Sequence, residues 1–468
     1  MTQEPWRLGA TELATAIARR ECSATDAARS VLARIDETNP RINALPDVLR
    51  SQALAAAQAA DEAQARGDAL GPLHGVPVTI KVNIDTAGTA NTDGIVACKD
   101  NMAPGDSPLV AHLRNAGAVI VGRSNTPAFS LRWFTDNDLH GRTLNPFDAG
   151  VTPGGSSGGA AAAVACGMGP IAHGNDYGGS VRYPAWACGV VGLRTTAGRI
   201  ASYKPSSPSR GITAQLMSVQ GPLTRSVADA RLALQVMAQA TPLDPYWVPA
   251  PLDYPVDDKP LRVALFKHHP AYDADPSVVA ALQQAAQWLA DAGCEVDEVA
   301  PPHFEEAAQL WRDLVYNDLR RVGVPAINAM GDAPVRKNLG FMMQDVPELD
   351  RDEYLDGLLR RQDIGREWAV FLEQYPVLLM PNSWERQFPI DDDTHSASRM
   401  QRIVAAQSPL LGTAMMGLPG LSVPTGLNSG LPVGVQLVAN RYREDRLLRA
   451  GALIEERAGF NAVEHLPF

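Results

Sequence analysis

Two serine sites lie in a segment that has little charge and much glycine. Residues 153–185 read PGGSSGGAAAAVACGMGPIAHGNDYGGSVRYPA, with three Gly-Gly pairs, one acidic residue and one basic residue. Glycine lacks a Cβ atom, so its backbone adopts turns and close approaches that other residues rarely allow. Such a segment suits either a tight turn leading into an alanine-rich core helix or a site where backbone contacts a ligand. In the second case, a serine hydroxyl activated by a neighbouring base is a candidate nucleophile.

One chemical interpretation makes Ser156 the nucleophile. Residues 154–158 read GGSSG, which fits the G-x-S-x-G pattern of α/β-hydrolase esterases. In those enzymes the serine lies on a sharp strand-to-helix turn, and an acid and a histidine follow it in the chain. The pattern is short, and a loop rich in glycine and serine matches it by chance.

Lys81 is a second residue that can transfer protons. It lies in PVTIKVNID, residues 77–85, where apolar and polar residues alternate with the period of a β-strand. A solvated polar face explains the alternation. A different explanation comes from three blocks in order along the chain: GPLHGVPVTIKVNIDTAG, PGGSSGG and GNDYGGSVRYPA. The second and third contain Ser156 and Ser180, which are 24 residues apart.

These three ordered blocks resemble the amidase signature family. The resemblance covers almost the whole chain and includes TDNDLHGRTLNPFDAG, GPLTRSVADARLAL and GLPGLSVPTGLNSGLPVGVQLVA. It implies one domain over residues 1–468, with the catalytic motifs in 65–240. It also implies hydrolysis of a carbon–nitrogen bond in a small amide through an acyl-enzyme. Aryl or alkyl amides are the expected substrates, and carbamates and esters share the same tetrahedral chemistry.

The resemblance implies a Ser-Ser-Lys triad. Ser180 is expected to be the nucleophile, Ser156 the proton relay and Lys81 the base, with a cis peptide bond between Gly155 and Ser156. Lysine is a base only when neutral, and burial lowers its pKa because the ammonium form loses its hydration. The low charge of residues 153–185 is consistent with such an environment. A relay serine could then also protonate the departing amine.

The glycine pair before the expected nucleophile has a separate implied role. The backbone N–H groups of Tyr177, Gly178, Gly179 and Ser180 are expected to form an oxyanion hole, which stabilises negative charge on the tetrahedral intermediate. The Tyr177 side chain is larger than the residue usual in the family and is a candidate for the substrate pocket. Asn175 stands where the family usually has threonine.

Supporting and substrate-binding residues are predicted around the triad. Ser157 is expected to hold the relay serine by hydrogen bonding. Asp176 and Arg182 match positions that brace the nucleophile loop, and they are equally compatible with an ordinary ion pair. Trp133 and Phe134 are candidates for an acyl or aryl pocket because aromatic walls favour flat apolar ligands; both also suit a protein core.

Strand and helix patterns alternate along the chain and predict an α/β fold. We expect a mixed, mostly parallel central sheet covered by helices on both faces, as the amidase resemblance also implies. Residues 305–373 differ because they are helical, rich in Arg, Asp and Met, and poor in strand signal. They are predicted to be a helical insertion that caps the substrate site, with Met342 and Met343 as an adaptable apolar lid.

Composition limits the classes of partner. The net charge of −11 argues against a nucleic-acid partner, because phosphate binding needs a basic surface. No segment has the pattern of a membrane helix or signal peptide. The five cysteines form no C-x-x-C pair, which suits reduced thiols and provides no zinc motif. We therefore expect a cytoplasmic enzyme with a small-molecule amide substrate, no metal or organic cofactor and no membrane partner; a homodimer is a family-level expectation.

Three alternatives to a stand-alone amidase remain. The glutaminase subunit of a tRNA-dependent amidotransferase belongs to the same family, but its usual SLDQIGP block reads LMSVQGP here and lacks the acid. An α/β-hydrolase that uses Ser156 would tolerate the loss of Lys81 and require a histidine. A non-catalytic binding protein on this scaffold would have no need of Lys81.

Overall fold

The computed structural model describes residues 3–255 and 259–468. Within these residues, 11 strands form one sheet in the order β1-β3-β2-β4-β6-β5-β10-β11-β9-β7-β8. The strands are β1 (Asp47–Val48), β2 (Pro77–Lys81), β3 (Val119–Ser124), β4 (Ile171–Asp176), β5 (Val191–Arg194), β6 (Val219–Thr224), β7 (Arg262–Leu265), β8 (Glu295–Glu298), β9 (Val377–Met380), β10 (Gly420–Asn428) and β11 (Leu431–Val438).

The sheet is mixed, as predicted, but it contains fewer parallel pairs than expected. β2 is parallel to β3 and β4, and β7 is parallel to β8 and β9. The remaining pairs between described strands are antiparallel. β10 and β11 illustrate the reason, because only Ser429 and Gly430 connect them and both have positive φ, at 49° and 81°. Such a two-residue turn joins antiparallel strands only.

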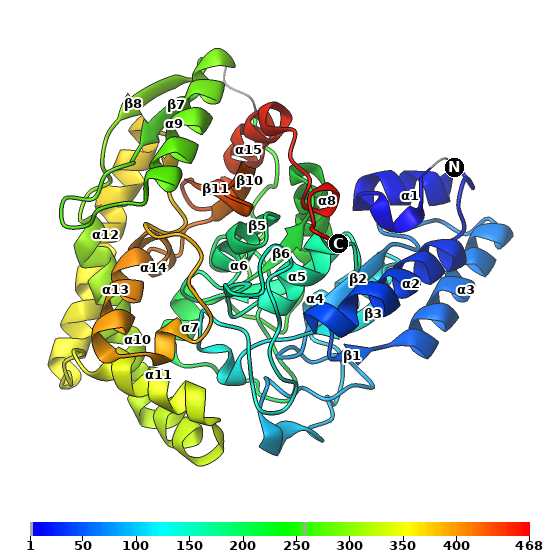
Figure 1. Cartoon of the computed structure of the whole chain (residues 1–468), viewed down its shortest axis with the longest axis horizontal. Coiled ribbons are helices and arrows are strands. Elements are labelled where there is room, and N and C mark those ends of the chain that lie inside the picture. The colour runs from blue at the N-terminus through cyan, green and yellow to red at the C-terminus, as the bar shows by residue number, and fades with distance from the viewer. Residues whose placement is uncertain (1–2, 256–258) are drawn as a thin grey trace.

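Helices cover both faces of the sheet. In the part of the chain that the structure describes, the α-helices are α1 (Ala10–Ala18), α2 (Ala24–Ile42), α3 (Arg50–Arg66), α4 (Pro108–Asn115), α5 (Gly158–Ala165), α6 (Arg182–Ala187), α7 (Ile212–Met217), α8 (Val227–Met237), α9 (Pro276–Asp291), α10 (Phe304–Met330), α11 (Ala333–Met343), α12 (Arg351–Gln374), α13 (Ala397–Ala406), α14 (Ser408–Met415) and α15 (Glu444–Ala458). Figure 1 shows α1–α3 at one end of the molecule and β7, β8 and α9 at the other.

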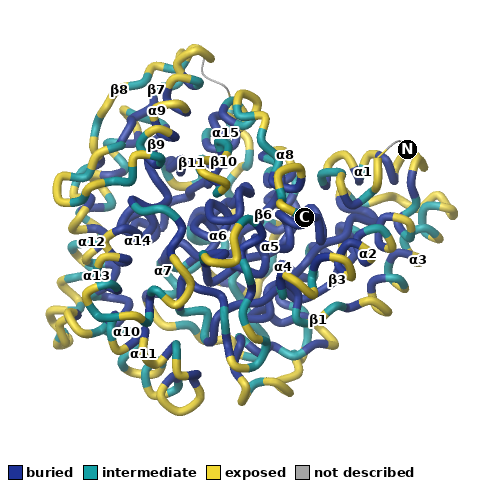
Figure 2. Tube along the Cα trace, viewed as in Figure 1, coloured by how far each residue is buried: buried dark blue, intermediate teal, exposed yellow. Residues whose placement is uncertain are grey.

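Successive residues of β3 belong to two different buried clusters, one on each face of the sheet. Val119 and Val121 belong to a buried cluster that includes α2, α3 and α5. Ile120, between them, belongs to a second cluster that includes α4, α8, α9 and α15. Since successive strand residues point to opposite faces, these helices form two layers with the sheet between them. Figure 2 shows the burial concentrated in this central region.

The predicted helical segment 305–373 consists of α10, α11 and α12. Asp332 caps α11 by accepting a hydrogen bond from the Val335 amide, and Asp350 caps α12 in a reciprocal box with Glu353. These caps divide the segment into separate helices. The turns between them let α10 and α11 pack around the sheet end that carries the glycine-rich loops.

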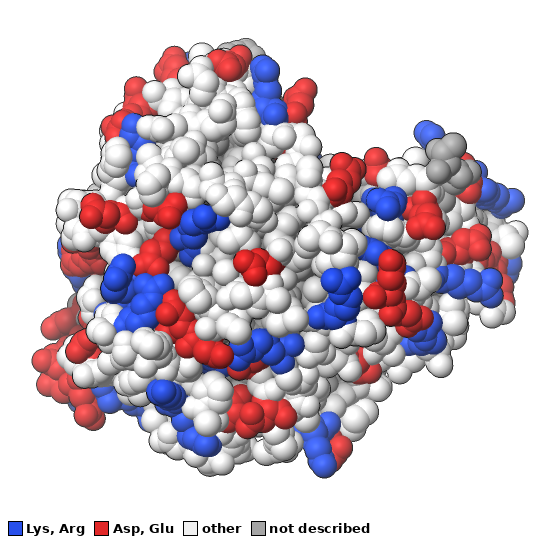
Figure 3. All heavy atoms as spheres, viewed as in Figure 1, with Lys and Arg blue, Asp and Glu red and all other residues white. Residues whose placement is uncertain are grey.

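Among the described residues, none of the helices has the length and hydropathy needed to span a membrane. On the face drawn in Figure 3, basic side chains are interspersed with acidic ones.

Candidate active site

Adjacent parallel strands bring the three predicted triad residues together. Lys81 is the last residue of β2, and Ser180 follows β4 in the loop before α6. β2 and β4 are parallel neighbours, so their carboxyl ends lie at the same edge of the sheet, where ligands bind in open α/β sheets. Ser156 precedes α5, which packs on both strands. The whole of β2 is buried, so its polar positions face protein rather than solvent.

The Lys81 ammonium nitrogen is completely buried and contacts three neutral side chains. Its Nζ atom lies 2.7 Å from Ser156 Oγ, 3.1 Å from Ser157 Oγ and 2.8 Å from Asn175 Oδ1. Burial lowers the pKa of Lys81 to about 7, although the Asp93 and Asp176 carboxylates oppose this shift. A substantial neutral fraction is therefore present near neutral pH, as a general base requires.

The two serine segments are joined to each other. The Ser157 amide donates a hydrogen bond to the Ser180 carbonyl at 3.2 Å. Ser156 and Ser180 both line a cavity of about 290 Å³, together with Asn175 and Tyr177. The cavity gives a ligand access to both hydroxyl groups.

A close backbone approach explains the glycine before Ser156. A Cβ atom at Gly155 would lie 2.5 Å from the Arg132 carbonyl oxygen and 2.7 Å from the Phe134 nitrogen. Any side chain would therefore separate the serine segment from residues 132–134. The Gly155–Ser156 peptide bond is cis, as predicted.

Asp176 organises the loop that carries Ser180. Its buried carboxylate accepts hydrogen bonds from the amides of Gly179 at 2.8 Å and Val181 at 3.2 Å. It also pairs with Arg182 at 2.9 Å and Arg194 at 3.0 Å. Burial raises the pKa of Asp176, but the two guanidinium groups outweigh it and hold the pKa well below its usual range. The geometry is that of a loop brace rather than of an isolated ion pair.

One expected oxyanion donor differs from the prediction. The Gly179 N–H donates to Asp176 Oδ1, so it is not free for a substrate oxygen. In the part of the chain that is described, the amides of Gly178 and Ser180 have no protein acceptor. These two groups, with Tyr177, are the remaining candidates.

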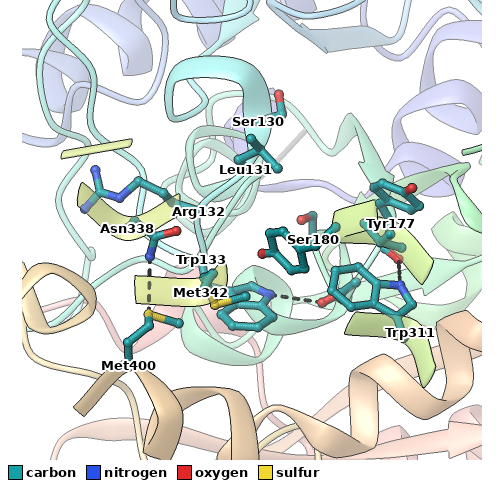
Figure 4. Close-up of a pocket in the computed structure, with 13 residues that line it drawn as sticks. Ser130, Leu131, Arg132, Trp133, Tyr177, Ser180, Trp311, Asn338, Met342 and Met400 are labelled. Carbon is teal, nitrogen blue, oxygen red and sulfur yellow. Dashed lines mark hydrogen bonds between the residues drawn. The ribbon is translucent and has the colours of Figure 1, made fainter. Parts of the chain in front are cut away.

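A second pocket meets the first at Ser180. It holds a cavity of about 30 Å³, and Figure 4 shows Trp133, Tyr177, Trp311 and Met342 around Ser180. Trp133 is fixed there by an indole hydrogen bond to the Gly178 carbonyl at 2.9 Å. Ser180 and Tyr177 lie in the walls of both pockets.

Phe134, predicted for the substrate pocket, and Met343, predicted for the lid, both lie outside the aromatic pocket. Phe134 stacks on Phe388 with ring centroids 6.0 Å apart, in the core. The indole of Trp133 bonds to the Ser180 loop, whereas the ring of the following residue, Phe134, packs on Phe388. Met342 lines the aromatic pocket, whereas Met343 packs outside its wall against the core.

Sequence reasoning missed two contributors. In the sequence Asn175 is only a departure from the family, yet in the structure it is a direct partner of Lys81. Asn175 lies near the end of β4, and the pairing of β4 with the strand of Lys81 is not visible in the sequence. Trp311 lies on α10, and no local pattern connects it with Ser180.

The fold and the site together define an amidase. Residues 26–448 match the family model described as Amidase. The chain belongs to the amidase signature family, and it is an amide-hydrolysing enzyme.

Several proteins with known names are similar to this chain. The chain is 44% identical over 456 residues to an indoleacetamide hydrolase of Bradyrhizobium diazoefficiens, covering 97% of this chain and 87% of the relative. It is 33% identical over 487 residues to one subunit of the glutamyl-tRNA(Gln) amidotransferase of Moorella thermoacetica, covering 98% of each. The structure of a 6-aminohexanoate cyclic dimer hydrolase complexed with substrate superposes with a TM-score of 0.82 at 27% identity, covering 100% of this chain and 98% of that one.

Membership of the amidase signature family excludes two alternatives, the α/β-hydrolase and the non-catalytic binding protein. The α/β-hydrolase interpretation of Ser156 is wrong, since the chain belongs to a different family. His173, which lies near Lys81, is also unsuited to a general base because its Nε2 atom bonds with Gln220 and burial lowers its pKa to about 3. The interpretation as a non-catalytic binding protein is wrong as well, because the chain is an amide-hydrolysing enzyme.

We predict that Asp176→Asn lowers the free energy of unfolding by about 3–5 kcal/mol, since it leaves two buried guanidinium groups without their counter-charge. Asp68→Asn is the matched control, because Asp68 pairs with Arg66 at the surface and such changes stay within about 0.5 kcal/mol. Denaturant unfolding of both variants measures the difference. Equal stability of the two variants would contradict the bracing role.

Proposed function

We propose that this enzyme hydrolyses primary amides of small arylacetic acids, with Ser180 as nucleophile, Ser156 as proton relay and Lys81 as base. The observation that carries the proposal is the position of Ser180 in the walls of both pockets, one polar and one aromatic. The similarity to an indoleacetamide hydrolase supports the same substrate class.

The hydrogen bonds around Lys81 support its role as base. A neutral amine has two N–H donors and one lone pair. Asn175 Oδ1 can only accept, so it takes one N–H. The Ser157 hydroxyl donates to the Asn175 backbone carbonyl at 3.4 Å and therefore accepts the other N–H. The lone pair is left facing the Ser156 hydroxyl at 2.7 Å, which can release its proton to Lys81 and take one from Ser180.

The same geometry separates the two halves of the substrate. Ser156 returns a proton to the departing amine, so the amine must lie on the side of the polar cavity that Ser156 lines. The acyl group then extends from Ser180 in the other direction, into the aromatic pocket. The amides of Gly178 and Ser180 are free to stabilise the oxyanion formed between these two sides.

The aromatic pocket suits a flat acyl group. Trp133, Tyr177, Trp311 and Tyr316 supply ring surfaces, and ring contacts favour aryl over alkyl groups. Met342 also lines this pocket, and its unbranched side chain is adaptable, which suits it to adjust to the shape of the acyl group.

The helical segment 305–373 takes part in this site through Trp311, Tyr316 and Met342. We therefore propose it as the substrate cap of a single domain that spans residues 1–468. The family-level expectation of a homodimer stays a prediction.

A glutaminase subunit of an amidotransferase is the second candidate, favoured by the relative that is 33% identical over 98% of the chain. Glutamine is a polar substrate, and an aromatic pocket beside Ser180 provides its acyl side chain with few hydrogen-bonding partners. The aryl amide proposal explains that pocket directly.

We predict that the wild-type enzyme releases ammonia from indole-3-acetamide and phenylacetamide faster than from hexanamide or L-glutamine. Ser180→Ala should lower kcat by at least about 10⁴-fold, because the acyl-enzyme cannot form. An anilide, an aryl carbamate and an aryl ester complete the substrate panel. Ser51→Ala, at an exposed helical position, should retain wild-type turnover.

Either of two results would contradict the proposal. Undiminished turnover by Ser180→Ala would remove Ser180 as nucleophile. Preference for L-glutamine, together with a co-purifying second subunit, would favour the amidotransferase function.

We predict that kcat/KM falls tenfold for each pH unit below about 7 and reaches a plateau above it, because only neutral Lys81 accepts a proton. The charged groups that act on Lys81 are Asp93, Asp176 and Lys204. The Asp93 carboxylate raises the Lys81 pKa, so Asp93→Asn should move the acid limb to lower pH. Rate profiles from pH 5 to 9 test both expectations, and a pH-independent rate would exclude Lys81 as the titrating base.

A further inference from the structure

Two tryptophans hold consecutive carbonyl groups of the nucleophile loop. Trp311 Nε1 donates to the Tyr177 carbonyl at 2.9 Å, and Trp133 Nε1 donates to the Gly178 carbonyl at 2.9 Å. Figure 4 shows the two indoles on either side of Ser180, each bonded to this short stretch of backbone. Both rings are buried, so little of the indole surface is open to solvent.

The two bonds have different consequences for the loop amides. In a trans peptide the N–H and C=O point in opposite directions. The bond from Trp133 therefore sets the direction of the Gly179 N–H, which Asp176 already holds. The bond from Trp311 sets the direction of the Gly178 N–H, which has no acceptor within the described chain and lies in the wall of the aromatic pocket.

The loop needs an external anchor at this peptide. Gly178 and Gly179 are the most freely rotating residues available, and Gly179 has a φ of 105°. The Trp311 ring also lies directly against Gly178, since a Cβ atom there would be 2.7 Å from Trp311 Cζ2. The edge of the same ring contacts Tyr177, with ring centroids 5.7 Å apart.

We infer that Trp311 is a positioning residue for the oxyanion hole. Its indole N–H fixes the Tyr177–Gly178 peptide so that the Gly178 N–H points at the oxygen of the tetrahedral intermediate. The inference rests on the proposed function, in which Ser180 is the nucleophile. It assigns α10 a part in transition-state stabilisation in addition to covering the substrate.

The test removes the indole N–H and keeps an aromatic ring, although a smaller one, at position 311. In Trp311→Phe, kcat for phenylacetamide should fall roughly 10- to 100-fold, a part of the loss seen when an oxyanion donor is deleted outright. KM should change less than about threefold, since the ring still lines the pocket. The affinity for benzyl trifluoromethyl ketone, which forms a tetrahedral oxyanion on attack by Ser180, should fall by the same factor as kcat/KM.

Two matched variants complete the design. Trp247→Phe also removes an indole bond to a backbone carbonyl, that of Ala238, and Trp247 lines neither pocket, so kcat should not change. Trp133→Phe should lower kcat less than Trp311→Phe, because Asp176 still holds the Gly179 peptide. If Trp311→Phe does not fold, benzothienylalanine at position 311 replaces the N–H by sulfur in a ring of similar shape.

The outcomes are distinguishable. A rise in KM with kcat unchanged, accompanied by a loss of ketone affinity no larger than that rise, would reduce Trp311 to a pocket wall and overturn the inference. Full turnover by Ser180→Ala would instead overturn the proposed function on which it rests. A parallel loss of kcat and ketone affinity in Trp311→Phe, with Trp247→Phe unchanged, is the expected result.

Discussion

The burial of Lys81 among neutral partners is the constraint on which the rest of the site depends. A buried lysine surrounded by carboxylates would stay protonated and could not accept a proton. Here its nitrogen contacts two serine hydroxyls and one amide oxygen. Burial then becomes the dominant influence on its pKa, which falls to about 7. The near-absence of charge in residues 153–185 thus helps to keep the pKa of Lys81 low.

The buried carboxylate of Asp176 lies on the face of β4 that is turned away from Lys81. Asn175 and Asp176 are consecutive residues at the end of β4, so their side chains point in opposite directions. The amide reaches Lys81, while the carboxylate reaches Arg182 and Arg194. Asp176 therefore braces the Ser180 loop strongly without pairing directly with the lysine. The two faces of β4 thus separate the partner of Lys81 from the support of the Ser180 loop.

Glycine and tryptophan act together around this arrangement. The Gly155 backbone lies against residues 132–134, which carry Trp133, and Gly178 lies against Trp311. Because these glycines have no side chain, the indoles reach the backbone of the Ser180 loop. The loop is then held by three contacts: Asp176 from the sheet, Trp133 from a nearby loop and Trp311 from α10. Flexible residues become ordered through contacts supplied by distant parts of the chain.

The sequence by itself determined the family, the α/β class, the helical character of residues 305–373 and the identities of Lys81, Ser156 and Ser180 as the candidate triad. These follow from local patterns: the alternation of strand and helix patterns and three ordered motifs. Only the tertiary structure decided which groups face one another. It showed that Asn175 contacts Lys81, that the Gly179 amide is already engaged, that Phe134 belongs to the core and that Trp311 reaches the loop. The physical reason is that strand order and helix packing bring together residues far apart in the chain, and no local pattern records that pairing.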